Sequence, residues 1–281
     1  MRKFLLPLPL IFTLAIACKD NSTDSGDNTA PDTSVSNEPP AITYTVLNAL
    51  PHDKDSYTEG FLVHDGKLYE SSGAPGDVDR TRSIVGIVDR ATGKISVKAE
   101  LDRKKYFGEG IAIINNKLYQ ITWRNFEGLI KKGFIYDLRT FKKIGEFDFP
   151  SNEGWGMTTD GKSLIMSDGS SNITFLDPVT FKTNRIVGVT DNNGPVGNIN
   201  ELEYVNGTIL ANRYETPYIL RIDPNTGKVL GKADFSSLVK ELKLKDPDAD
   251  YMNGIAYDSA KNKIYITGKL WPNIYEVRLN N

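Results

Sequence analysis

The residue best placed for acid–base chemistry is Glu109, which lies between two glycines in the segment YFGEGIAIINNKLYQITW, residues 106–123. Neighbouring glycines cannot cover its carboxylate, so its burial and its partners must come from elsewhere in the fold. If Phe107, Trp123 and Trp155 surround it, the loss of water would raise its pKa towards neutral pH, as a general base and acid requires. A solvated or lysine-paired glutamate at the start of a strand is the alternative.

A cationic donor could come from Lys269, in the segment TGKLWP at residues 267–272, and an amide from Asn200, in the segment NELEY. Such groups can stabilise negative charge that develops during a reaction. A surface lysine is the alternative for Lys269. Core packing is likewise the alternative for Trp155 and Trp271.

Metal and nucleophile chemistry find little support in the composition. The chain has two histidines, His52 and His64, both in turn-like surroundings and interpreted as surface or turn residues. Neither a histidine-rich zinc site nor a Ser-His-Asp triad is expected from them. No metal ligands and no cofactor are predicted.

The first residues indicate an exported protein. Arg2 and Lys3 precede an apolar run at residues 4–16 that is too short for a stable membrane span and is typical of a secretory signal. The only cysteine, Cys18, follows Ala-Ile-Ala, which resembles the lipidation motif of bacterial lipoproteins. We therefore expect residues 1–18 to be a lipoprotein signal peptide and the protein to be lipid-anchored in the cell envelope, periplasmic or at the cell surface. An ordinary signal peptide is the alternative.

Residues 19–40 are Asp, Ser, Thr, Asn and Pro with almost nothing apolar, a composition that predicts a disordered polar tether. Residues 41–281 are expected to be the folded catalytic domain. The formal charge of the chain is -2, and the loss of Arg2 and Lys3 would make it -4. No basic tract or face emerges, so nucleic acid is not an expected partner.

One pattern recurs five times along the domain. A polar or aromatic residue is followed by an apolar strand, a tight turn and a second strand. The residues at the heads of these repeats, 46 to 52 positions apart, are Glu59, Glu109, Trp155, Glu201 and Asn253. This spacing suits the blades of a propeller, so we predict an all-β, five-bladed β-propeller.

Four repeats continue into a second turn of the kind Asp-x-x-Thr-Gly or Asp-x-x-Thr-Phe, whereas the fifth ends early, near residue 281. Residues 42–50, ITYTVLNAL, could supply the missing outer strand and close the ring without exposed edges. A short capped helix is predicted over residues 235–244. In a closed ring the repeat heads meet at one mouth, which gives Glu109 its neighbours: Glu59, Trp155, Asn200 and Asn253.

Several motifs resemble one known family. They are FGEG-I from residue 107, the Thr-Trp pair ending at Trp123, SDGSS, NELEY, NGIAYD and TGKLWP. In order and spacing, from about residue 44 to residue 277, they resemble the glutaminyl-peptide cyclotransferases of the plant and bacterial type. The resemblance implies a five-bladed propeller and an acyl transfer that converts the N-terminal glutamine of a peptide or protein to pyroglutamate with release of ammonia.

The resemblance also implies roles for individual residues. Glu109 matches the acid/base, and Asn200 and Lys269 match polar groups that hold and polarise the substrate. Phe107, Trp123 and Trp155 match the aromatic wall. It implies no metal, no cofactor, a peptide or protein substrate and a membrane contact only through the lipid anchor; a monomer is expected.

Two positions depart from the family pattern. Many relatives have Phe-Thr-Gln-Gly where this chain has Tyr57-Thr58-Glu59-Gly60, which places a second carboxyl near Glu109. A tryptophan is expected where the chain has Arg213-Tyr214. We expect Tyr57, Glu59, Tyr214 and Asn253 to contact substrate.

Two other functions stay open on sequence alone. Carboxylates and amides at a propeller mouth also ligate hard cations, as in a metal-dependent lactonase or related hydrolase. A propeller without catalysis could bind peptide or glycan through the same mouth.

Overall fold

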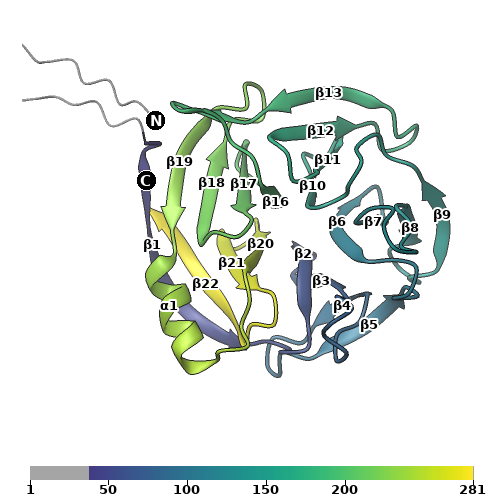
Figure 1. Cartoon of the computed structure of the whole chain (residues 1–281), viewed down its shortest axis with the longest axis horizontal. Helices are drawn as coiled ribbons and strands as arrows, with labels where there is room; N and C mark the ends of the chain where they lie inside the picture. The colour runs from purple at the N-terminus through teal and green to yellow at the C-terminus, as the bar shows by residue number, and fades with distance from the viewer. Residues whose placement is uncertain (1–37, 281) are drawn as a thin grey trace, which may run out of the picture. The chain divides into compact units, whose positions relative to one another are not determined.

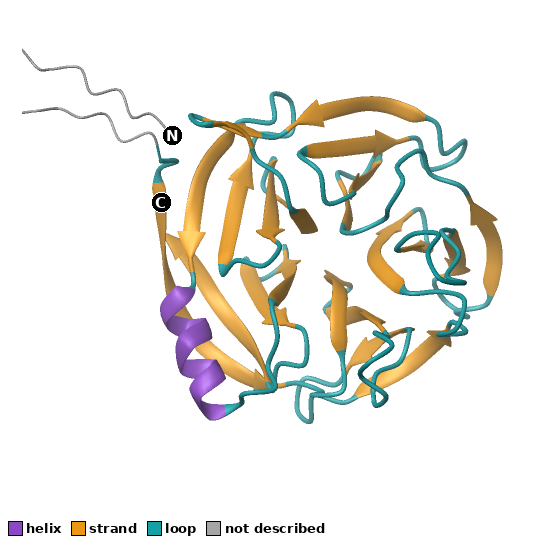
Figure 2. Ribbon diagram, viewed as in Figure 1, coloured by secondary structure: helices purple, strands orange, loops and turns teal. Residues whose placement is uncertain are grey.

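The structure is a computed structural model that describes residues 38–280, and these residues are built almost entirely of β-strands (Figure 1). Short sheets stand side by side around a centre, each with one strand facing inward (Figure 2). The predicted signal peptide, its lipidation residue Cys18 and residues 19–37 of the predicted tether lie outside the described residues.

Three sheets have four strands each, in sequence order. The first contains β2 (Tyr57–His64), β3 (Lys67–Gly73), β4 (Ile84–Val88) and β5 (Ile95–Glu100). The second contains β6 (Gly108–Ile114), β7 (Lys117–Thr122), β8 (Gly133–Asp137) and β9 (Lys143–Phe147). The third contains β10 (Met157–Thr159), β11 (Leu164–Ser167), β12 (Asn172–Leu176) and β13 (Thr183–Gly188).

An eight-stranded sheet holds two further four-strand sets joined edge to edge. One set is β16 (Ile199–Val205), β17 (Thr208–Arg213), β18 (Tyr218–Ile222) and β19 (Val229–Asp234). The other is β20 (Met252–Asp258), β21 (Lys263–Gly268), β22 (Asn273–Asn280) and β1 (Ala41–Pro51). A small ribbon, β14 (Thr190–Asp191) with β15 (Gly194–Pro195), stands apart. The four-strand sets correspond to the predicted repeats, and the all-β propeller prediction is confirmed.

The N-terminal strand closes the ring as predicted. β1 pairs antiparallel with β22, from Thr43 opposite Asn280 to Pro51 opposite Asn273. At its start β1 also pairs in parallel with β19 through residues 41 and 42. Because β1 supplies the strand that the last repeat lacks, both ends of the domain are tied into one sheet.

The recurring Asp-x-x-Thr turns share one backbone conformation. The side chain of Asp89 accepts hydrogen bonds from the N–H groups of residues 91 and 92 at 2.8 and 3.0 Å, and Asp177 does the same two and three residues on. The fifth turn residue is left-handed, with φ of +75° at Gly93 and +58° at Phe181. That conformation costs a non-glycine residue roughly 1–2 kcal/mol. The ring of Phe181 stacks on Phe147 with 4.4 Å between centroids, which offsets the cost.

Apolar side chains fill the space between neighbouring sheets. Ile173 and Phe175 of the third sheet, for example, pack with Ile209 and Leu220 of the next set, and all four are buried. Each such side chain contributes roughly 1.5–3 kcal/mol when it leaves water. This packing makes the inner strands a rigid frame for whatever lies at their heads.

Glycines at the strand heads let neighbouring inner strands touch. A Cβ atom at Gly110 would lie 2.3 Å from the backbone nitrogen of Met157, and one at Gly156 would lie 2.1 Å from the carbonyl oxygen of Asn200. No side chain fits at such distances. The close approach brings Glu109, which adjoins Gly110, to the same end of the fold as the heads of the next strands.

One helix, α1 (Ser236–Lys245), lies against the outside of the closing sheet (Figure 2). It is close to the predicted helix, but the expected side-chain cap is wrong: Phe235 at the N-cap offers no acceptor. Phe235 instead stacks on Tyr44 of β1 at 4.1 Å, so this position anchors the helix to the closing strand. Within residues 38–280 no helix has the length and apolar character of a membrane span.

Candidate active site

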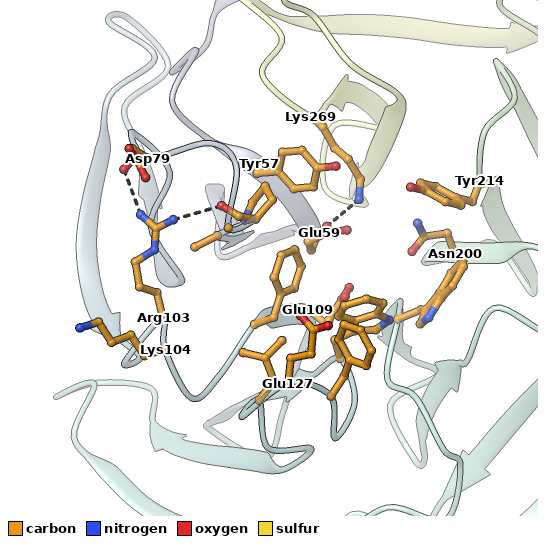
Figure 3. Close-up of a pocket in the computed structure, with 18 residues that line it drawn as sticks. Tyr57, Glu59, Asp79, Arg103, Lys104, Glu109, Glu127, Asn200, Tyr214 and Lys269 are labelled. Carbon is orange, nitrogen blue, oxygen red and sulfur yellow. Dashed lines mark hydrogen bonds and ion pairs between the residues drawn. The ribbon is translucent and has the colours of Figure 1, made fainter.

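The strand heads surround a pocket of about 900 Å³ (Figure 3). The predicted site residues that line it are Tyr57, Glu59, Phe107, Glu109, Trp123, Trp155, Asn200, Tyr214 and Lys269. Asn253 is the exception: it is fully buried behind Glu59 rather than at the pocket surface. Residues from all five repeats therefore converge, as a ring closed around one mouth requires.

Glu109 is the second residue of strand β6 and is only 5% exposed. Within residues 38–280 no group hydrogen-bonds or ion-pairs with its carboxyl. Burial, the largest cause, and the nearby charges of Glu59 and Glu153 raise its pKa well above the usual range, while the charge of Lys269 acts in the opposite direction. Glu109 is thus a carboxyl that keeps its proton to a higher pH than an ordinary glutamate and can exchange that proton with a ligand.

Lys269 and Glu59 form a buried ion pair with 2.6 Å between Nζ and Oε1 (Figure 3). Their side chains are 5% and 2% exposed, and Asn253 donates to the second Glu59 oxygen at 3.1 Å. Burial raises the pKa of Glu59, and Lys269 opposes that rise. The ammonium also lies 4.5 and 5.2 Å from the ring centres of Tyr57 and Tyr214. The ion pair with Glu59 and the two tyrosine rings hold Lys269 in place, and the Glu59 carboxylate compensates part of its positive charge.

Asn200 is the second residue of the inner strand β16 and is 3% exposed. Its backbone oxygen accepts a hydrogen bond from Ser167 at 2.7 Å, which fixes its position. Its Oδ1 atom is buried and finds no partner among the described residues. A buried amide oxygen left unpaired is costly, so a ligand that donates an N–H to it would be favoured.

Aromatic rings wall the pocket. The ring centres of Phe107 and Trp123 lie 5.9 Å apart, and Trp155 meets Tyr214 edge-on at 5.3 Å. Of the two residues Arg213 and Tyr214, Tyr214 lines this pocket, whereas Arg213 lines a different cavity. The phenol thus stands where the family pattern predicts an indole.

Glu153, which was not predicted as a site residue from the sequence, connects two tryptophans of this wall. Its Oε2 atom accepts hydrogen bonds from the indole N–H groups of both Trp123 and Trp155, each at 2.8 Å. Its Oε1 atom accepts from Arg124 at 3.0 Å. Only the proximity of Glu153 to Trp155 in the sequence hinted at this, because Trp123 lies thirty residues earlier and in the preceding repeat.

The interpretation of His52 as a surface or turn residue is wrong. Its side chain is fully buried, with Nε2 2.9 Å from Glu70, and Glu70 also accepts from Thr58 at 2.7 Å. Burial raises the pKa of Glu70, but the imidazolium charge and these hydrogen bonds outweigh it and hold the pKa below the usual range. The charged partner, 18 residues further along the chain, makes a buried histidine tolerable.

The His52–Glu70 pair supports the pocket from behind. His52 Nδ1 lies 2.8 Å from the carbonyl oxygen of Trp271, and Ser56 accepts a backbone hydrogen bond from Leu270 at 2.8 Å. These contacts connect the strand that carries Glu59 with the loop that carries its partner lysine.

Among residues 38–280 no group of three or more His, Cys, Asp or Glu side chains is arranged to hold a metal ion. The groups that converge near Glu109 are the ammonium of Lys269, the amide of Asn200 and the aromatic wall.

Comparisons with known proteins agree with this site. The family model described as Glutamine cyclotransferase matches residues 13–279. The chain is 39% identical to the glutaminyl-peptide cyclotransferase of Arabidopsis thaliana over 236 residues, which is 83% of this chain and 70% of that protein. It resembles the crystal structure of Myxococcus xanthus glutaminyl cyclase with a TM-score of 0.75 and 31% identity, over 86% of this chain and 99% of the other. The chain belongs to the glutamine cyclotransferase family.

Proposed function

We propose that this protein closes the N-terminal glutamine of a peptide or protein to pyroglutamate and releases ammonia. The observation that carries the proposal is the buried, unpartnered carboxyl of Glu109 in a pocket that also presents Lys269 and Asn200. The names of the two relatives, a glutaminyl-peptide cyclotransferase and a glutaminyl cyclase, support the same reaction.

The reaction forms one C–N bond and breaks another. The α-amine nitrogen attacks the carbon of the side-chain amide, a five-membered lactam forms, and the amide nitrogen leaves as ammonia. One proton must leave the attacking amine and one must reach the leaving nitrogen. Because both reacting groups belong to one residue, the protein chiefly selects the ring-closing rotamer, for which the aromatic wall provides a shaped enclosure.

Glu109 is suited to carry the proton. As a carboxylate it accepts a proton from the attacking amine, and as a carboxylic acid it donates one to the departing nitrogen. Its raised pKa lets it keep a proton that an ordinary carboxyl would have lost, so it can act as an acid as well as a base.

Lys269 and Asn200 are suited to stabilise the oxygen of the tetrahedral intermediate. An ammonium has three N–H donors, and the bond to Glu59 uses one of them. The loss of one such donor typically slows a reaction by roughly 10²–10³-fold. The unpaired Oδ1 of Asn200 offers a further contact, to an N–H of the substrate.

Mass spectrometry of a glutamine-initiated peptide incubated with the purified protein tests the proposal. Cyclisation gives a product lighter by one ammonia, and EDTA should not prevent it. Hydrolysis of the amide would instead leave a glutamate, a product heavier than the lactam by one water. An unchanged peptide, bound to a folded protein, would favour a binding function and contradict the proposal.

We further propose that the protein is a monomer held in the cell envelope by a lipid on Cys18. The sequence motif at Cys18 supports the anchor. Fatty-acid labelling that persists in Cys18→Ser would contradict the anchor, and a larger particle in analytical ultracentrifugation would contradict the monomer.

A further inference from the structure

The pocket continues past the groups assigned to the glutamine. Asn200 and Tyr214 lie on one side of it, whereas Arg103 and Lys104 lie on the other, beyond Glu109 (Figure 3). Its volume of about 900 Å³ is near the upper end of ordinary ligand pockets, which hold molecules much larger than one glutamine side chain. The amine and the side chain of the glutamine must both reach the reacting centre, and this far part of the pocket has room for the next residue of the peptide.

A tight turn forms one wall of the far part. Phe126 and Leu129 exchange backbone hydrogen bonds of 3.3 and 2.8 Å, and between them Glu127 and Gly128 have φ of +48° and +93°. Two successive positive φ values define a sharp turn that a glutamate adopts only at a cost. Strain of this kind persists where it positions side chains for function.

The ring of Phe126 is fixed although it is 43% exposed. The guanidinium of Arg124 lies 4.5 Å from its centre and 4.0 Å from that of Trp123, and Glu153 holds that guanidinium at 3.0 Å. A rigid aromatic surface open to a pocket can bind an apolar group with little loss of conformational entropy.

Charge does not favour an ionic ligand there. The charged side chains that line the far part are two of each sign: Asp79, Glu127, Arg103 and Lys104. The guanidinium of Arg103 is also occupied, because it donates to the carbonyl oxygens of Pro75 and Asp79 at 3.0 and 2.9 Å (Figure 3). Apolar contact with Phe126, Leu129 and Pro75 therefore remains as the main source of selectivity.

We propose that the turn of residues 126–129, with Ala74 and Pro75, is a subsite for a large apolar side chain at the second position of the substrate peptide. The inference rests on the proposed function and adds to it the class of peptide that the enzyme prefers.

The test compares kcat/KM for peptides that differ only after the glutamine, with Phe, Leu, Gly, Glu or Lys at the second position. The purified full-length protein is expected to favour Phe and Leu over Gly by about tenfold, the scale of discrimination by an apolar pocket. In Phe126→Ala the ratio of Phe to Gly should fall towards one, mainly through KM. Phe126→Leu should retain part of the preference.

Ile130→Ala is the matched control, since Ile130 is 40% exposed on the same loop but does not line the pocket. Its Phe to Gly ratio should equal that of the unchanged protein. Equal rates for all second residues, a preference for Glu or Lys, or an unaltered ratio in Phe126→Ala would overturn the subsite. If no glutamine peptide is cyclised at all, the proposed function itself fails, and the subsite with it.

Discussion

Replacement of Glu153 tests whether the aromatic wall must be held in place for catalysis. Glu153→Ala removes the shared acceptor of two indole N–H groups at 2.8 Å and the partner of Arg124 at 3.0 Å. A hydrogen bond to a charged group contributes about 1.5–3 kcal/mol when buried. The Glu153 side chain is 24% exposed, so water replaces part of this, and we expect a loss of about 2–4 kcal/mol in the free energy of unfolding. Displaced walls should lower kcat/KM by up to about 10²-fold.

Glu153→Gln separates position from charge. Its amide oxygen can accept hydrogen bonds from both indole N–H groups. Its NH₂ group would face the guanidinium of Arg124, and because both groups are donors, no hydrogen bond can form between them. Both variants remove the negative charge that raises the pKa of Glu109, so in both the acidic limb of the kcat/KM profile should move to lower pH. Only the alanine variant should lose most of its activity.

Steady-state kinetics and tryptophan fluorescence read out these effects, because two of the three tryptophans bond to Glu153. Glu100→Ala, which removes another arginine-paired acid that does not line the pocket, is the control and should alter neither readout. Activity of Glu153→Ala within a few-fold of the unchanged protein, or equal losses in the alanine and glutamine variants, would show that catalysis does not depend on Glu153 holding the two indoles.

Three more predictions concern buried charge and metal. Burial raises the pKa of Glu203 from 4.5 to about 8. As pH rises through that interval, the unfolded chain loses this proton before the folded protein does, so the free energy of unfolding should fall. At about 1.4 kcal/mol per pKa unit, the fall is at most about 5 kcal/mol. Glu203→Gln has the shape of the neutral carboxyl and should lose less stability between about pH 5 and pH 8; urea titrations with equal losses in both proteins would contradict this. Glu59→Gln removes a charge that raises the pKa of Glu109, so the acidic limb of kcat/KM should move to lower pH, and a limb that stays or rises would contradict the coupling. Prolonged EDTA treatment should leave the cyclisation rate unchanged, whereas a loss restored by a divalent cation would support a metal-dependent mechanism.

The sequence predicted most of the fold because the information is local and repeated. Each repeat carries its own turn residues, so its strands could be read without knowledge of the rest. The fifth repeat lacks its outer strand, which led to the prediction that β1 pairs with that repeat and closes the ring. The heads of the repeats could then be placed together by symmetry, which brought Glu109 and Asn200 into one pocket.

Contacts specific to single side chains could not be predicted in this way. The bond between Glu153 and Trp123 joins neighbouring repeats, and the burial of His52, which follows β1, depends on Glu70 of β3 in a different sheet. Asn253 shares the position of a repeat head with Glu109, yet it lies behind Glu59 because packing, not periodicity, decides which head reaches the surface. A repeat pattern locates the mouth but not the partner of each group within it.

The rate of ammonia release by Glu109→Gln tests most directly whether Glu109 carries the proton. A glutamine keeps the shape of the carboxyl but cannot shuttle the proton. We expect a fall in kcat of roughly 10²–10⁴-fold, with the substrate still bound by the folded variant in calorimetric titration. Release of ammonia within a few-fold of the unchanged protein would show that another group carries the proton.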